Sequence, residues 1–544
     1  MLKTVTLGAG QDLSLSDIEA VAYGRAQVAL APAARERVGA FRARAEEALQ
    51  RELARNPGKR VYGLNTGFGS NFRLYVSPSE LKQLQENLIL SHCTGMGPPA
   101  PAPVVRATML MRAASLAQGH SIVRPAVIDA LIAMLNANVT PAVPRYGTVS
   151  ASGDLAPLSH IAAVVIGKGR VLNERGEPVP TADYLAEAKP AFTPITLEMK
   201  EGLALNNGCQ YSNAWGALAT AMMRRLVEAA ALNAALGVQV MRGTGRPFRA
   251  DLHALRPHPG SQTIAAWVFD LLEGYEFQDA GVDAKFAYDE KIQDPYNLRC
   301  AAQVLGPCLD LIARAEKTLL IEAQAVTDNP IDLNQSLDSY DLDLITSGGH
   351  FHGMPLAVDC YGLLQAAGTM ASLSNLRCAR IVDPTRNKGL GPQARGHDAK
   401  ATESGLMLTE YTTAGLCNHI WGLSMPSHML SLPTDSGQED HVSMAANVGM
   451  RAYEAAERLA EILAIEMAFA AQAEYVRGAE AGKHAEALKP AALGKRTGAA
   501  LDAINKAFPR VVSDRELSWD MMSLAEKVMS GEIVQATGYS FTRH

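Results

Sequence analysis

The sequence predicts a mainly α-helical protein built around a bundle of long helices. Runs rich in alanine and leucine dominate the chain, and both residues favour helices. Residues 443–476 are apolar on nearly every face, which is typical of a helix buried among other helices. At about 1.5 Å per residue this segment would span roughly 50 Å. That length exceeds one compact domain and indicates a bundle shared between subunits.

Periodicity and capping signals predict the helices in order along the chain. Ser14 and Ser16 are N-cap candidates for a first short helix, and Pro125 suits the first turn of a later one. Residues 171–179 are typical of a short hairpin around a turn. Longer helices are expected over residues 31–55, 79–92, 103–119, 125–138, 210–241, 294–327, 356–381, 405–423 and 443–476.

The length of 544 residues exceeds the roughly 250–300 at which a single core stops growing. We expect three parts. An N-terminal domain over residues 1–200 carries two loops rich in small residues, a central long-helix bundle covers residues 201–480, and a C-terminal helical appendage covers residues 481–544.

Composition excludes several classes of protein. A net charge of −6 leaves no basic surface for nucleic acid. No apolar run reaches the roughly 18 residues of a membrane span, and the first residues lack the apolar core of a signal peptide. The seven cysteines include no CxxC pair, which argues against disulfides and cysteine-rich zinc sites. We therefore expect a soluble, cytoplasmic protein with no nucleic-acid or membrane partner.

Three small adjacent residues, Ala151, Ser152 and Gly153, could build an electrophile from the main chain. If the fold brings the Gly153 amide nitrogen against the Ala151 carbonyl carbon, loss of water closes a five-membered imidazolone. Loss of the Ser152 hydroxyl then leaves an exocyclic methylene. Glycine suits the attacking position because it lacks a Cβ atom and adopts conformations that other residues avoid. The bare tripeptide also occurs in ordinary turns, so the residues around it decide its meaning.

The string from Gly147 to His160 closely resembles the signature of the aromatic amino acid ammonia-lyase family. This resemblance implies that the tripeptide forms the family's cofactor, 4-methylidene-imidazol-5-one, autocatalytically and without an external cofactor. Elimination of ammonia needs an electrophile, whereas the ordinary side chains supply nucleophiles, acids and bases. In the family the substrate amine adds to the methylene, and a base then removes the β-hydrogen.

Two further strings resemble motifs of the same family. Residues 62–69, Tyr-Gly-Leu-Asn-Thr-Gly-Phe-Gly, match the loop whose tyrosine is the catalytic acid/base, which implies this role for Tyr62. The loop lacks the Gly-Lys-Ser/Thr of a phosphate-binding loop, so nucleotide binding is disfavoured. Asn207 stands in a segment that resembles the family's Asn-Gly-Thr, which implies a place beside the electrophile. Cys209 departs from that pattern, where threonine is usual.

The string from Gln293 to Arg299 is a third match. Tyr296 and Arg299 are three residues apart and therefore share one helical face. The guanidinium fork suits a carboxylate. The resemblance implies that Arg299 anchors the substrate carboxylate, that Gln293 also binds substrate, and that Tyr296 belongs to the catalytic set.

The resemblance places His92 in the pocket that grips the substrate ring. Its pair Ser-His resembles histidine ammonia-lyases, although some tyrosine-selective members also carry it. Residues 438–444, Gln-Glu-Asp-His-Val-Ser-Met, resemble the histidine enzymes most.

Two positions of the expected ring pocket depart from the family pattern. His419 stands where glutamate is usual, and Glu410 is a candidate to replace the missing carboxylate. His350 stands where asparagine is usual, next to Phe351, which is expected to bind substrate. His350 and His352 would supply fewer than the three or four ligands that zinc takes, so no metal is expected.

Five ordered motifs carry the resemblance over about residues 12–480. It implies a long-helix bundle of the ammonia-lyase (fumarase/aspartase-like) type, with a smaller N-terminal helical region carrying the electrophile loop. It also implies a homotetramer whose active sites combine more than one subunit. The expected reaction converts an aromatic L-amino acid to its trans-α,β-unsaturated acid, with histidine and urocanate, a step of histidine catabolism, preferred over tyrosine or phenylalanine.

Two alternatives stay open at this point. A 2,3-aminomutase would use the same electrophile and return the amine to the β-carbon. A non-catalytic helical scaffold would explain the changes at His350 and His419, but the intact tripeptide, Tyr62 and Arg299 argue against it.

Overall fold

A computed structural model describes residues 2–67, 75–77, 79–279, 293–396, 398–483 and 491–541. Helices dominate these residues, as the sequence predicts, and the described strands form two-stranded sheets. Contacts within the chain divide it into two compact units. The first comprises Met1–Ala221, Glu316–Cys360 and Pro426–Met450, and the second comprises Met222–Ala315, Tyr361–Met425 and Arg451–His544. The expected three-part division at residues 200 and 480 stays a prediction.

The first unit opens with a small β-α-β arrangement that the sequence pattern did not reveal. Strands β1 (Lys3–Leu7) and β2 (Ala26–Leu30) pair in parallel, and α1 (Leu15–Ala22) connects them. Ser14 caps α1 as predicted: its hydroxyl accepts the amide hydrogen of Asp17 at 3.2 Å, and the Asp17 carboxylate accepts that of Ser14. Five-residue strands are too short for their alternation to stand out beside helical runs.

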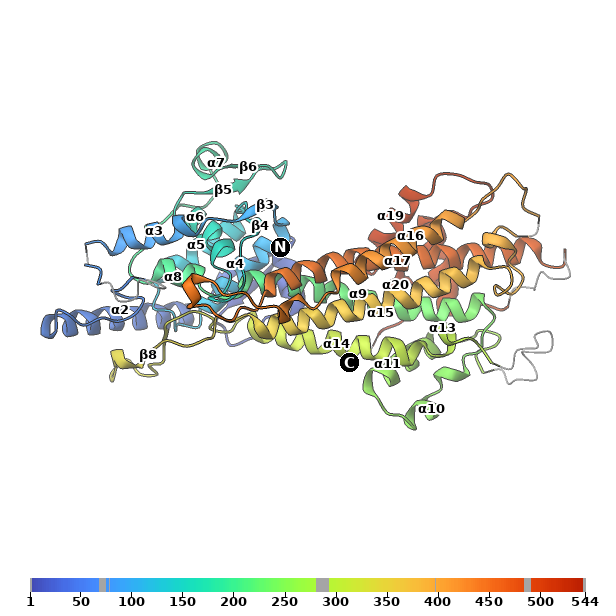
Figure 1. Ribbon diagram of the computed structural model, residues 1–544, viewed down its shortest axis with the longest axis horizontal. Coiled ribbons are helices and arrows are strands. Elements are labelled where there is room, and N and C mark those ends of the chain that lie inside the picture. Colours follow the sequence, from blue (N-terminus) through green and yellow to red (C-terminus); the bar gives the residue numbers. More distant parts are fainter. Residues whose placement is uncertain are drawn as a thin grey trace. The chain divides into compact units, whose positions relative to one another are not determined.

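Helices α2 to α8 form most of the first unit. Figure 1 shows α3, α6 and α8 packed together, with α4 against α5. Proline in the first turn begins α2 and α5. The bounds are α2 (Pro32–Arg55), α3 (Leu81–His92), α4 (Ala102–Leu116), α5 (Pro125–Asn136), α6 (Leu155–Val165), α7 (Thr181–Ala188) and α8 (Glu201–Asn206).

Three short antiparallel strand pairs also belong to this unit. The pair β5 and β6 confirms the hairpin predicted over residues 171–179. The pairs are β3 (Met96–Pro99) with β4 (Pro144–Tyr146), β5 (Arg170–Leu172) with β6 (Pro178–Pro180), and β7 (Ile331–Asp332) with β8 (Ile345–Thr346).

Four long helices contain residues of both units. They are α9 (Gln210–Val240), α14 (Ala301–Glu322), α15 (Met354–Val382) and α17 (Ala445–Glu480). Helix α17 has 36 residues, which corresponds to about 54 Å at 1.5 Å per residue. Its side chains Leu459, Ile462 and Leu463 are fully buried, as expected for a helix that is apolar on most faces.

A buried ion pair joins three of these helices inside the second unit. The Glu466 carboxylate of α17 accepts hydrogen bonds from Arg377 of α15. It also accepts bonds from the Ser374 hydroxyl of α15 at 2.6 Å and from the Asn233 amide of α9 at 3.0 Å. All four side chains are buried. Because a buried carboxylate is costly unless it is hydrogen-bonded, this network favours one register of the three helices.

The remaining helices lie in the second unit. The helix predicted over residues 294–327 is interrupted at Cys300, whose φ of −100° and ψ of 11° end α13 before α14 begins. The described residues 495–536 are largely helical, as predicted, and Thr497 of α18 donates to Gln239 of α9 at 2.7 Å. The bounds are α10 (Ala250–Ala254), α11 (Pro259–Leu271), α13 (Tyr296–Arg299), α16 (Met407–Leu423), α18 (Lys495–Ala507), α19 (Ser518–Ser530) and α20 (Glu532–Ala536).

Short 3-10 helices cover Arg246–Phe248, Leu342–Leu344, Pro392–Ala394, Ser427–Met429 and Asp435–Gly437. Across the described ranges, none of the helices combines the length and apolar character that crossing a bilayer requires.

Candidate active site

Residues 147–154, here called the electrophile loop, form a sharp bend between β4 and α6 in the first unit. Three of its residues have positive φ: Gly147 at 146°, Ser150 at 52° and Gly153 at 78°. Serine rarely adopts this left-handed region, so the surrounding contacts must hold Ser150 there. Ala151 is buried and Ser152 is half-buried. The main chain is thus bent where ring closure would need it.

A buried carboxylate fastens the base of the electrophile loop. Asp154 accepts the Ser150 hydroxyl at 2.8 Å, and it accepts both the amide and the hydroxyl of Ser212 at 2.7 Å. Burial raises the pKa of Asp154, and these hydrogen bonds oppose the rise. Since Ser212 lies in the first turn of α9, the network ties the loop to the start of that helix.

A segment from much later in the chain contacts the same loop. The Ser443 hydroxyl donates to the Ser150 carbonyl oxygen at 2.9 Å, across 293 residues of sequence. The Ala446 amide donates to the Ser150 hydroxyl at 3.2 Å. The Met444 amide donates to the Val149 carbonyl oxygen at 2.9 Å. These contacts explain how Ser150 is kept in its unusual conformation.

The segment between α8 and α9 also lies against the loop. The Asn207 side-chain amide donates to the Ser152 carbonyl oxygen at 3.1 Å. Gly153 and Gly208 form a parallel bridge, and the Asp154 amide donates to the Gly208 carbonyl oxygen at 2.6 Å. A Cβ atom on Gly153 would overlap the Gly208 main chain, so glycine is required at the nitrogen that would attack. The arrangement suits the chemistry predicted for the tripeptide.

Sequence reasoning missed a carboxylate at Ser152. The Ser152 hydroxyl donates to one carboxylate oxygen of Glu439, and the Thr434 hydroxyl donates to the other at 2.7 Å. Glu439 lies in the string 438–444, which carried the resemblance without giving this residue a role. Because 287 residues separate the two partners, their contact has no local signal in the sequence. The structure adds Glu439 to the candidate site.

Helix α8 connects the Tyr62 loop to the electrophile loop within the first unit. Gly63 has a φ of 78°, and a Cβ atom there would lie 3.3 Å from the Leu203 side chain of α8. Helix α8 ends at Asn206, so the same short helix backs the Tyr62 loop and presents Asn207 to the electrophile loop. Tyr62 is half-buried. Residues 68–69 of the predicted loop lie outside the described residues.

Cys209, which departs from the family pattern, contacts Phe351. Its thiol donates to the Phe351 carbonyl oxygen at 2.8 Å. Burial, reinforced by the Asp154 and Glu322 carboxylates, raises the pKa of this thiol well above its ordinary value. A protonated thiol can donate the hydrogen bond that a threonine hydroxyl would, so the exchange keeps a donor here. Phe351 is half-buried, and His350 is exposed.

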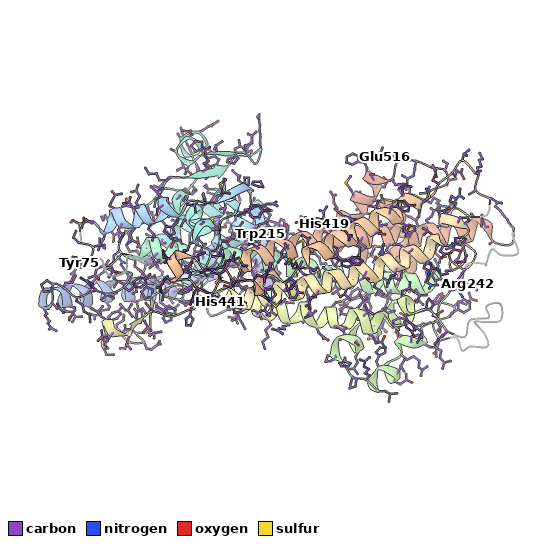
Figure 2. All side chains as sticks on the ribbon, in the orientation of Figure 1. Tyr75, Trp215, Arg242, His419, His441 and Glu516 are labelled. Atoms are coloured by element: carbon purple, nitrogen blue, oxygen red, sulfur yellow. The ribbon has the colours of Figure 1, made fainter. Side chains whose placement is uncertain are left out.

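His352 pairs with His441 instead of His350. The two rings stack with centroids 5.5 Å apart, and Nδ1 of His441 lies 3.4 Å from Nε2 of His352. Figure 2 labels His441. In the part of the chain that the structure describes, no three His, Cys, Asp or Glu side chains are grouped to hold a metal ion.

His92 ends α3, which packs against α6 and α8. Helix α6 begins at Leu155, directly after the electrophile loop, and α8 leads into Asn207. The Ser91 hydroxyl lies 3.1 Å from Nδ1 of His92. His92 therefore belongs to the same unit as Ser152, and its contact with a substrate ring stays a prediction.

Gln293, Tyr296 and Arg299 belong to the second unit, and Gln293 is exposed. On α13 the Arg299 guanidinium lies 4.7 Å from the Tyr296 ring centroid, as expected for residues on one face. Arg299 Nε donates to the Asp294 carbonyl oxygen at 2.8 Å. No carboxylate of the described residues pairs with this guanidinium, whose fork suits an external one. A site shared with Ser152 stays a prediction.

His419 lies on α16 in the second unit (Figure 2). Its Nε2 lies 2.9 Å from a carboxylate oxygen of Glu454 on α17, and both side chains are about half exposed. Glu454 thus supplies a carboxylate beside His419, a pairing that the sequence did not indicate. That Glu410 replaces the missing carboxylate of the ring pocket stays a prediction.

Glu322 should make the stability of the protein depend on pH. Burial raises the pKa of its carboxyl to about 7, above the roughly 4.3 of an unfolded chain. The unfolded chain releases this proton near pH 4, whereas the folded protein holds it up to pH about 7. The unfolding free energy is therefore highest below pH about 4 and falls as pH rises towards 7. Glu322→Gln is therefore expected to raise the unfolding free energy by about 1–3 kcal/mol at pH 8 and to change little at pH 4.

Urea unfolding of this variant at both pH values measures the effect. Glu36→Gln, at an exposed position of α2, is the matched control and should change neither value. An equal gain at pH 4 and pH 8 would contradict the assignment.

The model of the aromatic amino acid lyase family matches residues 13–506 of this chain. A histidine ammonia-lyase of Deinococcus radiodurans is 37% identical over 525 residues, which cover 96% of this chain and 94% of that protein.

Two solved structures share the fold. A tyrosine aminomutase of Streptomyces globisporus has a TM-score of 0.88 at 28% identity and covers 100% of both chains. A histidine ammonia-lyase of Trypanosoma cruzi has a TM-score of 0.84 at 28% identity, covering 98% of this chain and 95% of that one. The mainly helical, long-helix fold predicted from the sequence is thus confirmed.

Proposed function

This chain belongs to the aromatic amino acid lyase family, and from that premise we propose that it eliminates ammonia from L-histidine to give urocanate. The observation that supports this proposal most is the bent tripeptide of the electrophile loop, where the Gly153 main chain packs directly on that of Gly208. An ordinary turn would not need two glycines in contact, a buried carboxylate beneath it and a second carboxylate at its serine. The relatives named histidine ammonia-lyase support the choice of substrate.

The electrophile would be 4-methylidene-imidazol-5-one, formed from Ala151, Ser152 and Gly153. The residues present fit this group, because Gly153 carries no Cβ atom that would collide with the Gly208 main chain and Asn207 already donates to the Ser152 carbonyl oxygen. When formed, the group would supply the electrophilic carbon that side chains lack. The hydrogen bond from Asn207 would draw electron density from that carbonyl and so favour attack by an amine.

Tyr62 would move the proton in the elimination. A phenol has an ordinary pKa near 10, so its action as a base near neutral pH needs a stabilised phenolate. The electrophile loop leads into the N-terminus of α6, and Asn207 and Gly208 lead into that of α9. The positive ends of these two helix dipoles would provide such stabilisation.

The substrate ring would meet histidine side chains. His92 would bind the imidazole through a ring nitrogen that can donate or accept a hydrogen bond. We also keep the ring-binding role that the family resemblance implies for His419, whose Nε2 lies 2.9 Å from Glu454. A phenyl ring has no hydrogen-bonding atoms and would leave such groups unpaired, which favours histidine over phenylalanine.

Incubation of the purified protein with histidine, tyrosine or phenylalanine tests this proposal. The ultraviolet absorbance of urocanate should grow with histidine, together with one ammonium ion per product. If only coumarate or cinnamate absorbance grew, the substrate would be tyrosine or phenylalanine and not histidine.

A 2,3-aminomutase is the second candidate, because a tyrosine aminomutase is among the similar structures. It would keep the nitrogen and yield a β-amino acid. Release of no ammonium with formation of that product would favour the mutase.

Arg299→Lys should weaken substrate capture more than folding. The guanidinium would hold the substrate carboxylate through two parallel hydrogen bonds, and an ammonium cannot reproduce this geometry. We expect KM to rise by about tenfold or more, with an unchanged unfolding temperature. Arg246→Lys in the same unit serves as a control that should leave KM unchanged. An unaltered KM in Arg299→Lys would reject the anchor role.

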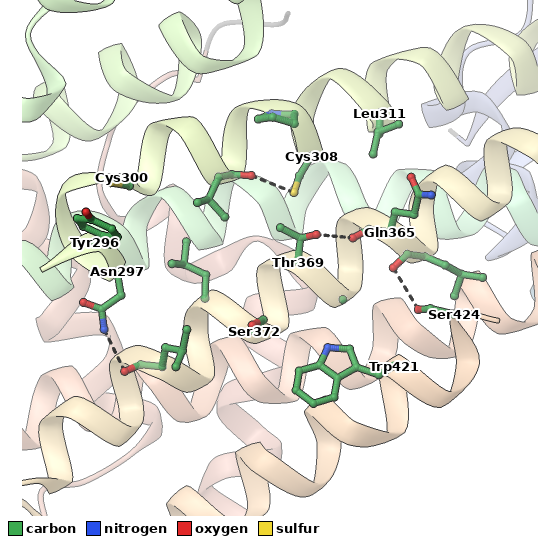
Figure 3. Close-up of a pocket in the computed structure, with 16 residues that line it drawn as sticks. Tyr296, Asn297, Cys300, Cys308, Leu311, Gln365, Thr369, Ser372, Trp421 and Ser424 are labelled. Atoms are coloured by element: carbon green, nitrogen blue, oxygen red, sulfur yellow. Dashed lines mark hydrogen bonds between the residues drawn. The ribbon is translucent and has the colours of Figure 1, made fainter. Parts of the chain in front are cut away.

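A groove on the second unit supports a homo-oligomer. Helices α13, α14, α15 and α16 line a cavity of about 850 Å³ (Figure 3). Trp421 and Tyr296 at this cavity are 52% and 71% exposed. Such apolar surface is typical of a protein interface. We propose that another copy of the chain covers it, within the homotetramer that the family resemblance implies.

Light scattering of the parent protein should then give the mass of four chains, and Trp421→Glu should lower it. A fully active single chain in solution would contradict this assembly.

All seven cysteines are free thiols, which suits the cytoplasm as the compartment we propose.

A further inference from the structure

Gly153, whose nitrogen would close the ring, lies directly against the main chain of Gly208. The main chain of Gly208 fills the space where a side chain of Gly153 would stand. The Asp154 amide next to it donates to the Gly208 carbonyl oxygen at 2.6 Å. Gly208, which joins the Asn207–Gly208 peptide to the next one, therefore limits how Gly153 can bend towards Ala151.

One buried arginine holds that peptide from α4. Arg112 Nη1 donates to the Asn207 carbonyl oxygen at 2.6 Å and to Gln210 Oε1 at 3.1 Å, and its Nη2 donates to the Ser115 hydroxyl at 2.9 Å. A Cβ atom on Gly208 would lie 2.6 Å from Arg112 Nη1. The guanidinium thus packs against the far end of the peptide whose near end touches Gly153.

The Arg112 guanidinium is a charged group that is buried away from water, which costs free energy. Its side chain is fully buried, and its Nε has no hydrogen-bond partner among the described residues. None of the described carboxylates forms a salt bridge with it. Burial lowers the pKa of Arg112 to about 10, and the charge of Asp328, which is paired with Lys200, opposes the fall, so Arg112 stays protonated at neutral pH. A buried cation without a carboxylate in salt-bridge contact is costly, and packing alone would be served as well by an apolar side chain.

We propose that Arg112 is a positioning residue for ring closure, which it assists by holding the Asn207–Gly208 peptide against Gly153. This inference rests on the proposed function, because it concerns formation of the same electrophile. In the step concerned, the Gly153 nitrogen bonds to the Ala151 carbonyl carbon. The former carbonyl oxygen leaves as water with the amide hydrogens of Gly153 and Ser152. A second water takes the Ser152 hydroxyl and its α-hydrogen, and no oxidant or reductant is needed.

Cell-free synthesis of the full chain, sampled over time by intact mass, measures this step directly. Ring closure followed by loss of the Ser152 hydroxyl lowers the mass by two water molecules, whatever amino acid is the substrate. Arg112→Met and Arg112→Lys should close the ring more slowly than the parent by about ten- to hundredfold, since each loses hydrogen bonds to a charged donor in fixed geometry. Circular dichroism of the same samples reports whether they are folded.

Arg106→Met is the matched control. Arg106 lies on the same helix, is 6% exposed, and donates to the Val21 carbonyl oxygen at 3.1 Å, away from the electrophile loop. It should close the ring at the parent rate even if it unfolds at a lower temperature.

The outcomes separate the two proposals. A parent protein without the two-water deficit overturns the electrophile itself. A parent with the deficit and folded Arg112 variants that close the ring equally fast overturn only the role of Arg112. If Arg112→Met does not fold, the rate of ring closure in Arg112→Lys decides whether Arg112 positions the peptide. If neither folds, Arg112 serves folding and the positioning role is rejected.

Discussion

Ser152→Ala is expected to abolish the elimination of ammonia while the fold survives. Alanine has no hydroxyl to lose, so the second dehydration cannot occur and no methylidene carbon can form. Loss of a group that acts covalently lowers kcat by roughly three to six orders of magnitude. The removed hydroxyl is half-buried and bonded to the Glu439 carboxylate, whose partner Thr434 remains. Stability should therefore fall by no more than about 1–2 kcal/mol.

Three measurements on this variant belong together: kcat with histidine, intact mass and thermal unfolding. The mass should lack the deficit of two waters that we expect in the parent. Ser530→Ala, at an exposed position of α19, is the control and should keep both the deficit and the activity. A fully active Ser152→Ala protein would refute the mechanism.

Tyr62→Phe is expected to keep the deficit of two waters and still lose most turnover. We assign to the phenol the transfer of the substrate proton and no part in the condensation of the three loop residues. Removal of a general acid or base lowers kcat by about 10²–10⁴-fold. The half-buried ring still packs in its loop, so unfolding should change little.

The control for this variant is Tyr75→Phe, which removes an exposed hydroxyl from a residue bridged to Thr66 of the same loop. Parent-like turnover in Tyr62→Phe would remove its acid/base role. Together, Ser152→Ala and Tyr62→Phe separate two steps. Intact mass reports whether the electrophile forms, and turnover reports whether it is used.

The helices were predictable because their signals are local. Apolar faces, proline in first turns and the Ser14 cap all lie within a few residues of the structure that they specify. The strands β1 and β2 could not be predicted in this way, because five residues with few buried side chains leave a weak pattern between helical runs. The break at Cys300 was also missed, since no glycine or proline marks it.

The candidate site was predictable where a motif is continuous in sequence. The tripeptide and Asn207 are such residues, and they meet in the structure through the hydrogen bond to the Ser152 carbonyl oxygen. Glu439 and Glu454 were given no role, because each contacts a partner that lies far away in the sequence. Such pairings depend on how helices pack, which a single sequence does not display.

In the proposed reaction, the contacts of Ser150 with Ser443 and Ala446 would also set the time at which the electrophile can arise during biosynthesis. A nascent chain leaves the ribosome with residues 151–153 long before those partners have been translated. Maturation would therefore wait until residues 443–446 have been made, and a fragment that stops before Ser443 would keep an ordinary peptide backbone. Once closed, such a covalent ring would outlast denaturation, so a mature chain could be unfolded and refolded without repeating the chemistry.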